Sequence, residues 1–525
     1  MNVYLFQPQY KRNRKIKYWL PYAVSCIWSY CNQFPEIQEN YILKDVIFKR
    51  ENPKELLERL DNPAICAFST YVWNEQYCLG IAKLIKEKFP NCIIEFGGPQ
   101  ACVKMQDQYD FIDTIIVAEG EESFYDILTR ILNKQEIPKV YDKKRLESLD
   151  YPSPYQSGIF DMLVKKHPDY QWATTLETNR GCPHRCTFCD WGGTILSSIG
   201  FFDMNRVEAD LEWIRTHNVD AIFLADANFG MFRERDLEIA ALMKRKFDDN
   251  SSVKEIILQY AKNSTEVVFK MASLLDVYTL RGITISVQSV NQPTLKAIKR
   301  KNLHINNLKS HMELSQKYNV KTYTEMILGL PEETLESWKD GISLVMECGQ
   351  HNSLEVWFCQ LLNNSELATE LSKNLYGIES VNALNYMPIE SIDGDTEDHG
   401  FVEYSVIVNK TNTMSTKEMI EAYMYFWVIR YFHYNGHTKE ISKNSGMTYR
   451  KFYELLTEVL LSFDNPVRDE YFETKEQITQ YLNTGTLSQN KRGHNFELYN
   501  INDRSLLTSE ETQFELSRRL TEALC

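Results

Sequence analysis

Residues 179–193, NRGCPHRCTFCDWGG, hold three cysteines whose spacing decides how the central region of the chain is interpreted. Cys182, Cys186 and Cys189 are separated by three and then by two residues, so one short loop can surround a cube of iron and sulfide. A tetrahedral zinc site or a self-contained electron-transfer cluster uses four protein ligands. No fourth cysteine lies nearby, and we expect His184 to hydrogen-bond locally or face solvent. The loop therefore predicts a cluster with one iron open to a further ligand.

Apolar runs alternate with helical patterns on both sides of this loop. The predicted strands read TTLETN, DAIFLAD, EIILQYA, GITISVQS, VKTYTEMIL and LEVWFCQLL, and amphipathic stretches such as RVEADLEWIRTH and TLESWKDGISLVMEC separate them. Six such units predict a partial β/α barrel over residues 171–375. The cysteines follow its first strand, at the end where barrels place their active sites.

Residues 1–145 show a similar alternation. NVYLFQP, YILKDVIF, AICAFST, CIIEFGG and TIIVAEG read as strands, with PKELLERL, QYCLGIAKLIKEKF and ESFYDILTRIL as helices. This predicts a Rossmann-like parallel sheet wrapped by helices, and ligands of such sheets bind beyond the carboxyl ends of the strands. The residues at those ends are Ser69, Thr70, Tyr71, Val72, Trp73, Asn74, Gly97, Gly98, Pro99, Glu119, Gly120 and Glu121.

Two further regions complete the expected α/β organisation. Residues 146–170 contain three prolines and a glycine and read as a linker between domains. The βα rhythm stops near residue 380, and KEMIEAYMYFWVIRYFHY and KFYELLTEVLLSF predict a mostly helical domain over residues 380–525.

Composition narrows the classes of function. The 525 residues include 58 Lys and Arg against 72 Asp and Glu, and the net charge of -14 opposes binding to nucleic acid. We expect a cytoplasmic protein, because no apolar stretch of ~18 residues and no signal-peptide pattern is found. Twelve cysteines are too sparse for a disulfide scaffold of this length.

The cysteine loop resembles that of the radical S-adenosylmethionine (SAM) superfamily, and two later segments agree with the resemblance. SVQSVNQPTLKAIKR, residues 286–300, is similar to the family's fourth strand and following helix, and TEMILGLPEETLESW, residues 324–338, is similar to its fifth-strand signature. The resemblance covers about residues 170–375. It implies a 4Fe-4S cluster on the three cysteines, with SAM on the open iron and cleaved to a 5′-deoxyadenosyl radical.

The resemblance also implies residues that hold SAM. Phe188 precedes the last cysteine, as the family's loop requires. The family's usual Gly-Gly-Glu is replaced by Asp226-Ala227-Asn228, so either Asp226 or Asn228 is carried over for the methionyl amine. The remaining candidates are Ser286, Gln288 and Glu325.

The N-terminal domain resembles that of the cobalamin-dependent branch of the superfamily. The matching stretches are FSTYVWN (68–74), EFGGP (95–99) and VAEGEES (117–123). Many cobalamin domains supply a histidine to cobalt, but no histidine precedes His167 here. The domain either binds no corrinoid or binds cobalamin with its base displaced and no histidine on the lower face. We favour the second interpretation, with Trp73 as a candidate to lie under the corrin.

These resemblances imply a cobalamin-dependent radical SAM C-methyltransferase, which transfers a methyl group through methylcobalamin to an unactivated carbon. YVWN and CDWG are similar to methyltransferases of antibiotic biosynthesis, so we expect a natural-product-like small molecule or peptide as substrate. An external flavodoxin or ferredoxin would supply electrons, and no nucleic acid or membrane partner is expected. Two alternatives stay open, a non-methylating enzyme such as an oxidative cyclase or ring-contracting enzyme, and a non-catalytic cobalamin-binding sensor.

Overall fold

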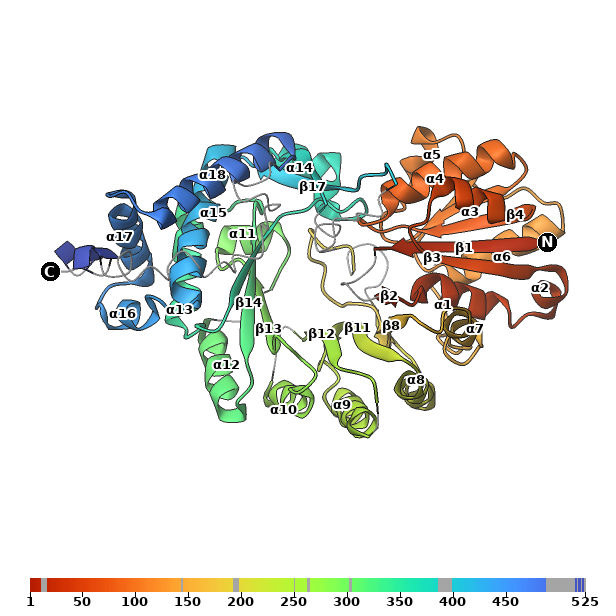
Figure 1. Cartoon of the computed structure of the whole chain (residues 1–525), viewed down its shortest axis with the longest axis horizontal. Helices are drawn as coiled ribbons and strands as arrows, with labels where there is room; N and C mark the ends of the chain where they lie inside the picture. Colours follow the sequence, from red (N-terminus) through yellow and green to blue (C-terminus); the bar gives the residue numbers. More distant parts are fainter. Residues whose placement is uncertain are drawn as a thin grey trace.

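The structure is a computed structural model that describes residues 1–10, 17–142, 145–191, 198–249, 251–261, 265–301, 305–385, 399–487, 515–516, 518–520 and 522–523. Figure 1 shows an N-terminal sheet domain at one end, a barrel in the middle and a helical region at the other end. None of the helices within these ranges is long and apolar enough to span a membrane.

The N-terminal domain is the predicted parallel sheet with helices on both faces. Its strand order is β3-β1-β4-β5-β6-β7, and every pair is parallel. The strands are β1 (Asn2–Gln9), β3 (Ile42–Lys49), β4 (Pro63–Ser69), β5 (Ile93–Gly97), β6 (Thr114–Val117) and β7 (Val140–Asp142), and the helices are α1 (Tyr22–Cys31), α2 (Pro35–Asn40), α3 (Pro53–Arg59), α4 (Glu75–Lys88), α5 (Met105–Gln108) and α6 (Glu121–Leu132). The order reverses between β1 and β4, and such a reversal places a binding crevice at the strands' carboxyl ends.

The two faces of this sheet carry different cores, because side chains alternate along each strand. Phe68 stacks on Phe6 at 4.3 Å between ring centroids and on Phe96 at 5.0 Å, on one face. Leu5 and Ala67 belong to the other core, which includes residues of α1 and α6. The core of this second face is therefore continuous with the core of the barrel.

All six predicted barrel strands are present. They are β8 (Gln171–Leu176), β11 (Val219–Phe229), β12 (Glu255–Tyr260), β13 (Ile283–Gln288), β14 (Thr322–Leu328) and β15 (Leu354–Phe358). The covering helices are α8 (Met204–Thr216), α9 (Arg233–Asp248), α10 (Glu266–Leu275), α11 (Gln292–Ala297), α12 (Ile305–Tyr318) and α13 (Leu335–Glu347). The strands form two parallel sheets, β12-β11-β8-β2 and β13-β14-β15, which confirms the open barrel.

A short strand from the N-terminal region extends the barrel sheet, which the expected boundary at residue 145 does not anticipate. This strand, β2 (Lys17–Trp19), pairs in parallel with β8. Lys17 forms a largely buried ion pair with Asp220 at 2.5 Å, and Leu20 N donates to Ala173 O at 2.8 Å. The chain thus visits the barrel before completing the first domain, so the two domains share a backbone connection besides the linker.

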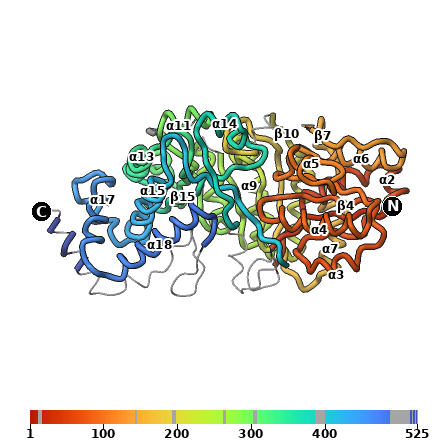
Figure 2. The backbone as a smooth tube through the Cα atoms, turned by 90° about the horizontal axis from the view of Figure 1, so that it is seen from above, coloured from red at the N-terminus to blue at the C-terminus, as the bar shows by residue number. Residues whose placement is uncertain are grey.

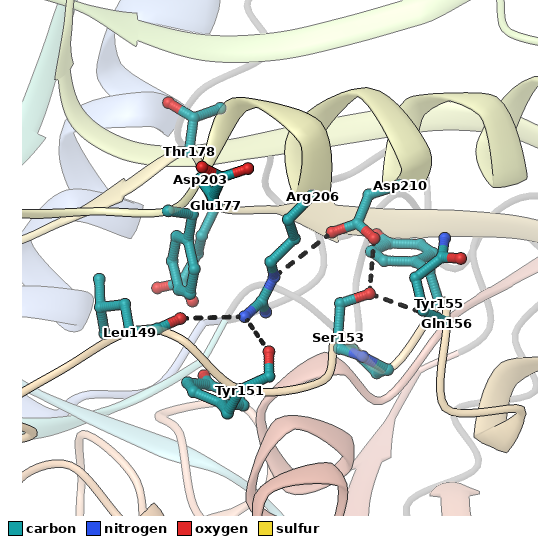
Figure 3. Close-up of polar contacts among 12 residues, drawn as sticks. Leu149, Tyr151, Ser153, Tyr155, Gln156, Glu177, Thr178, Asp203, Arg206 and Asp210 are labelled. Carbon is teal, nitrogen blue, oxygen red and sulfur yellow. Dashed lines mark hydrogen bonds and ion pairs between the residues drawn. The ribbon is translucent and has the colours of Figure 1, made fainter.

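Residues 146–170, which were expected to be a linker, contain a helix, α7 (Ile159–Lys166). Strand β7 ends at Asp142, just before this region. Its first part is fixed to α8 by polar contacts (Figure 3). Arg206 Nη1 donates to the carbonyls of Tyr151 at 2.7 Å and Leu149 at 3.3 Å. One turn later, Asp210 accepts from Ser153 Oγ at 2.5 Å. These bonds attach residues 149–153 of the expected linker to α8.

The C-terminal region is mostly helical, as predicted, but it also contains an antiparallel strand pair. Its elements are a 3-10 turn (Glu366–Ala368), α14 (Glu370–Tyr376), β16 (Glu379–Leu384), β17 (Tyr404–Lys410), α15 (Thr416–Ile429), a π-helical turn (Arg430–Tyr434), α16 (Lys439–Asn444), α17 (Tyr449–Leu461) and α18 (Pro466–Thr484). Trp427 of α15 is 1% exposed and packs on Tyr431 and Tyr471. The aromatic side chains of this helix are therefore core.

The segment just before β17, which contains Glu403, contacts the N-terminal domain (Figure 2). Arg50 Nη1 donates to Glu403 Oε1 at 2.7 Å, and both side chains are fully buried. Glu403 also accepts from the backbone N–H groups of Gln76 at 2.8 Å and Tyr77 at 3.0 Å, at the start of α4. The first and last regions of the chain are therefore joined across the barrel.

Candidate active site

A cavity of about 970 Å³ lies between the carboxyl ends of the N-terminal strands and the cysteine loop. Cys189, Asp190 and Trp191 line it from the barrel, and Leu362 and Asn364 line it after β15. The predicted cobalamin residues that line it are Ser69, Tyr71, Trp73, Gly97, Gly98, Pro99, Glu119, Gly120 and Glu121. The cysteine loop and the predicted cobalamin residues, which were predicted separately, therefore line one chamber.

Thr70, Val72 and Asn74 are not among the lining residues and instead hold the loop after β4. The Asn74 side chain accepts from Tyr71 N at 2.7 Å and donates to Pro8 O at 3.0 Å. Thr70 Oγ1 donates to Gly97 O at 2.8 Å, and Asn385 Nδ2 donates to Val72 O at 3.0 Å. These residues shape the wall rather than face the chamber.

Gly98 allows two backbones to approach each other at the cavity edge. Its φ is +88°, and a Cβ at this position would lie 2.6 Å from Thr70 N and 2.7 Å from Thr70 O. No side chain fits there, so the wall is made of backbone that a large flat ligand can approach.

Tyr71 and Trp73 form a flat aromatic surface on the same wall. Their rings are stacked with centroids 4.5 Å apart and planes 11° apart, and both residues line the cavity. Burial raises the pKa of the Tyr71 hydroxyl, so this ring stays neutral. The surface is suited to contact with a planar macrocycle.

The three cysteines begin the barrel side of the chamber, after β9 (Asn179–Arg180). Cys182 is 6% exposed and Cys186 is 4% exposed, whereas Cys189 is partly exposed and lines the cavity. Arg300 Nη1 lies 3.9 Å from Cys186 Sγ as a weak donor, and burial lowers the pKa of its guanidinium against the opposing influence of Cys186. The Arg300 guanidinium therefore places a positive charge beside the loop that would hold the cluster.

Among the described residues, no group of three His, Cys, Asp or Glu side chains could hold a single metal ion. Thiolates of a cubane cluster bind different irons and so surround a cube rather than a point. The donor set of three thiols in one loop fits a cluster of this kind and would leave one iron open.

Asp226 and Asn228, the two alternatives for the methionyl amine, occupy different environments. The Asp226 carboxylate accepts from the backbone N–H and hydroxyl of Thr178 and from the backbone N–H and amide of Asn179. Burial raises its pKa to about 7, although these bonds oppose the shift. Asn228 Nδ2 donates to Cys182 Sγ at 3.3 Å, and its buried Oδ1 has no partner within the described structure. The unpartnered acceptor on Asn228 is the better candidate to receive an amine.

The strand-end residues of the second barrel sheet lie together. Ser286 Oγ donates to Glu325 Oε2 at 3.1 Å, and burial raises the pKa of Glu325. Gln288 is 8% exposed, has φ +65°, and its Oε1 is buried without a partner in the described part of the chain. An unpartnered acceptor at a strained strand end is typical of a ligand site. Phe188 packs against the main core, so its part in binding SAM stays a prediction.

Sequence reasoning missed Arg180, which connects the barrel to the first domain. Its guanidinium donates to Glu121 at 2.9 Å, to Glu177 at 2.7 Å and to Tyr151 Oη at 3.2 Å, and it approaches Glu119 at 3.4 Å. Arg180 and Glu177 both lie between β8 and the cysteine loop, whereas Glu119 and Glu121 follow β6 of the first domain. A buried arginine among acidic groups fixes the edge of the chamber.

Other missed lining residues come from β1, α1 and β5. They are Leu5, Gln7, Gln9, Tyr10, Tyr22, Ala23, Val24, Cys26, Ile27 and Glu95. Most are apolar residues that look like ordinary core in the sequence. Glu95 could have indicated a ligand site in the sequence, because it is a charged residue inside an otherwise apolar strand.

Comparison with known proteins agrees with this architecture. Residues 176–345 match the Radical SAM superfamily. The chain is 31% identical over 464 residues to the cobalamin-dependent radical SAM methyltransferase TokK of Streptomyces tokunonensis, covering 83% of this chain and 67% of that protein. It is 30% identical over 466 residues to 2-(S-pantetheinyl)-carbapenam-3-carboxylate methyltransferase of Streptantibioticus cattleyicolor, with the same coverage.

Solved structures share the fold. TsrM from Kitasatospora setae, a radical SAM methyltransferase with cobalamin and a [4Fe-4S] cluster bound, has a TM-score of 0.56 at 13% identity, covering 92% of this chain and 99% of that one. The cobalamin-dependent SAM radical enzyme OxsB, with aqua-cobalamin and SAM bound, has a TM-score of 0.56 at 15% identity, covering 100% and 79%. The fold and site thus define a radical SAM enzyme. The chain belongs to the cobalamin-dependent radical SAM methyltransferases.

Proposed function

We propose that the enzyme transfers a methyl group to an unactivated carbon of a small natural-product-like substrate. The observation that carries this proposal is the shared chamber, in which Cys189 and the strand-end residues Trp73 and Gly98 line one cavity. When bound, the cluster with SAM supplies a carbon-centred radical, and cobalamin supplies the methyl group. The narrower relation to carbapenem-type substrates rests on the name of one relative, the carbapenam-3-carboxylate methyltransferase.

The chain's own residues would hold each group as follows. Cys182, Cys186 and Cys189 would hold the cluster, and Asn228 Oδ1 would accept from the SAM amine. The Tyr71–Trp73 stack would face the corrin on one side. The described lining includes no histidine, so the walls offer no imidazole to cobalt.

The junction would protect reactive species from water. Glu119 and Glu121 both bind Arg180, and Asn364 Nδ2 donates to Pro99 O at 3.0 Å and to Ala101 O at 2.8 Å. These contacts connect the walls on two sides of the chamber. Excluding water from a site limits the side reactions of a radical.

An external carrier of flavodoxin or ferredoxin type would supply electrons. Lys296 and Lys301 are exposed near the cysteine loop, because the segment between them meets the loop where Thr187 N donates to Ile298 O at 3.1 Å. A local cationic group on an acidic chain would attract an acidic carrier.

The cytoplasmic location of the protein stays a prediction.

The test uses protein reconstituted anaerobically with iron, sulfide and hydroxocobalamin, then supplied with SAM that carries a trideuteriomethyl group. We expect 5′-deoxyadenosine, and we expect the label in the product formed from candidate carbapenam-like or peptide substrates. A modified product without the label would favour the non-methylating alternative. Cluster binding without any SAM consumption would favour the sensor alternative.

A further inference from the structure

Glu95 has a buried carboxyl group that faces the chamber and takes no part in the hydrogen bonds of the described chain. The residue is 4% exposed and lines the cavity. Neither an ion pair nor a hydrogen bond joins it to any residue that the structure describes. Because its carboxyl oxygens face the cavity and make no bond to the described chain, a ligand in the chamber can supply the missing partner.

The sheet register places Glu95 on the face that α1 and α6 cover. Glu95 is opposite Ala67 of β4, and Ala67 is opposite Leu5 of β1, so these side chains form one row across the sheet. A Cβ on Gly97 would lie 3.1 Å from Glu95 Oε1, so the glycine leaves the room that the carboxyl group occupies. The carboxyl group therefore lies close to the strand end, where a ligand enters from the chamber.

The surroundings of Glu95 are apolar. Leu5, Ala67 and Ile116 line the cavity from the sheet, and Val24 and Ile27 line it from α1. Burial raises the pKa of Glu95 to about 8, so the carboxyl group is neutral at physiological pH and can donate one hydrogen bond. An anion such as a phosphate would be expensive to desolvate among these side chains. A flat, mostly apolar group with a single acceptor atom fits them best.

We propose that Glu95 recognises the displaced base of cobalamin, by donating a hydrogen bond to the base nitrogen that no longer binds cobalt. This inference rests on the proposed function, because it requires cobalamin in the chamber. A benzimidazole is flat and apolar apart from that nitrogen, which matches one donor in an apolar wall. Glu95 would therefore set which base the enzyme accepts, independently of the residues that contact the corrin ring.

The test measures dissociation constants of the full-length protein for three corrinoids at pH 7. Hydroxocobalamin carries the benzimidazole, a p-cresolyl cobamide carries a base without nitrogen, and cobinamide has no nucleotide. Glu95→Leu should weaken binding of hydroxocobalamin by about 10-fold, as loss of one buried hydrogen bond predicts, and leave the other two within about 2-fold. Glu95→Gln keeps a donor and should retain most of the affinity. Glu87→Gln on the exposed side of α4 is the matched control.

The outcomes separate the two proposals. If Glu95→Leu weakens all three corrinoids equally, or weakens none, Glu95 does not recognise the base and the inference is overturned. If the unsubstituted protein binds no corrinoid at all, the proposed function fails instead. Thermal unfolding of each variant shows whether it is folded, and Glu95→Gln provides a second reading should Glu95→Leu not fold.

Discussion

Arg180 Nη1 donates to Glu121 Oε1 at 2.9 Å, across the junction between the barrel and the N-terminal domain. Burial alone would raise the pKa of Glu121, but the charge of Arg180 and its hydrogen bonds outweigh burial and lower it. The ion pair therefore stays charged at neutral pH and orders the chamber edge beside the cysteine loop.

Arg180→Ala should destabilise the protein strongly, because it leaves Glu121 and Glu119 buried without their cation. Removing one partner of a buried pair costs about 3–5 kcal/mol in the free energy of unfolding. Urea denaturation at pH 7 measures this. Arg215→Ala is the control, since Arg215 forms a solvent-exposed pair with Glu212 and its loss should cost far less. Similar costs for the two variants would contradict the role of the junction.

Substitution of any one of Cys182, Cys186 and Cys189 by Ala should abolish SAM cleavage and reduce iron bound after reconstitution. Three thiolates are the complete protein donor set of the proposed cluster, so none has a substitute. Iron content, visible absorbance and 5′-deoxyadenosine formation with dithionite measure the outcome. Cys348→Ala, a partly exposed cysteine outside the loop, is the control and should retain all three signals. Cleavage retained in a loop variant would refute the assignment.

Asn228→Leu should weaken SAM binding by about 10-fold while the cluster still assembles, because the variant removes the unpartnered acceptor beside Cys182. Equilibrium dialysis of reconstituted protein with SAM measures the dissociation constant. Asp226→Leu should instead mainly lower the unfolding temperature, since it removes the acceptor for Thr178 and Asn179. The opposite pattern would assign the amine to Asp226.

Glu95→Gln should stabilise the cobalamin-free protein above pH 5. The folded-state pKa of about 8 lies above the unfolded value of ~4.3, so folding takes up a proton and stability is lost as pH rises between these values. Gln removes this loss, so the gain in unfolding temperature should be small at pH 4.5 and largest at pH 8. The other titratable groups lining the chamber are Tyr10, Tyr22, Cys26, Tyr71, Glu119, Glu121, Glu177, Arg180, Cys189 and Asp190, and these are common to both proteins. A gain that does not depend on pH would contradict the shifted pKa.

Much of the architecture could be predicted because it follows from local patterns. Apolar alternation identified β1, β3 to β6, β8 and β11 to β15, and the helix at residues 416–429 starts with the capping box of Ser415 and Glu418. The pairing of β2 with β8 was missed, because three residues carry too little pattern to indicate a strand. The antiparallel pair β16 and β17 was missed for a related reason, since its partners are separated along the chain and only docking joins them.

In the candidate site, too, some residues could be predicted from the sequence and others required the structure. Phe188, Ser286 and Glu325 came from motif positions, and Ser286 and Glu325 do lie in contact. The choice between Asp226 and Asn228 required the structure, because both are polar residues at one strand end and differ only in their partners. Glu95 stood within a recognised stretch, but its missing partner could be seen only after folding.

The sequence by itself determined the three thiols of one loop and the two βα series, since these depend on spacings of a few residues. The tertiary structure decided that Arg180 meets Glu121, 59 residues away, and that Asn228 meets Cys182, 46 residues away. Such contacts depend on strand register and on how the domains dock, which the burial of many side chains fixes together. The cysteine loop could therefore be recognised in the sequence, whereas the chamber into which it opens exists only in the folded chain.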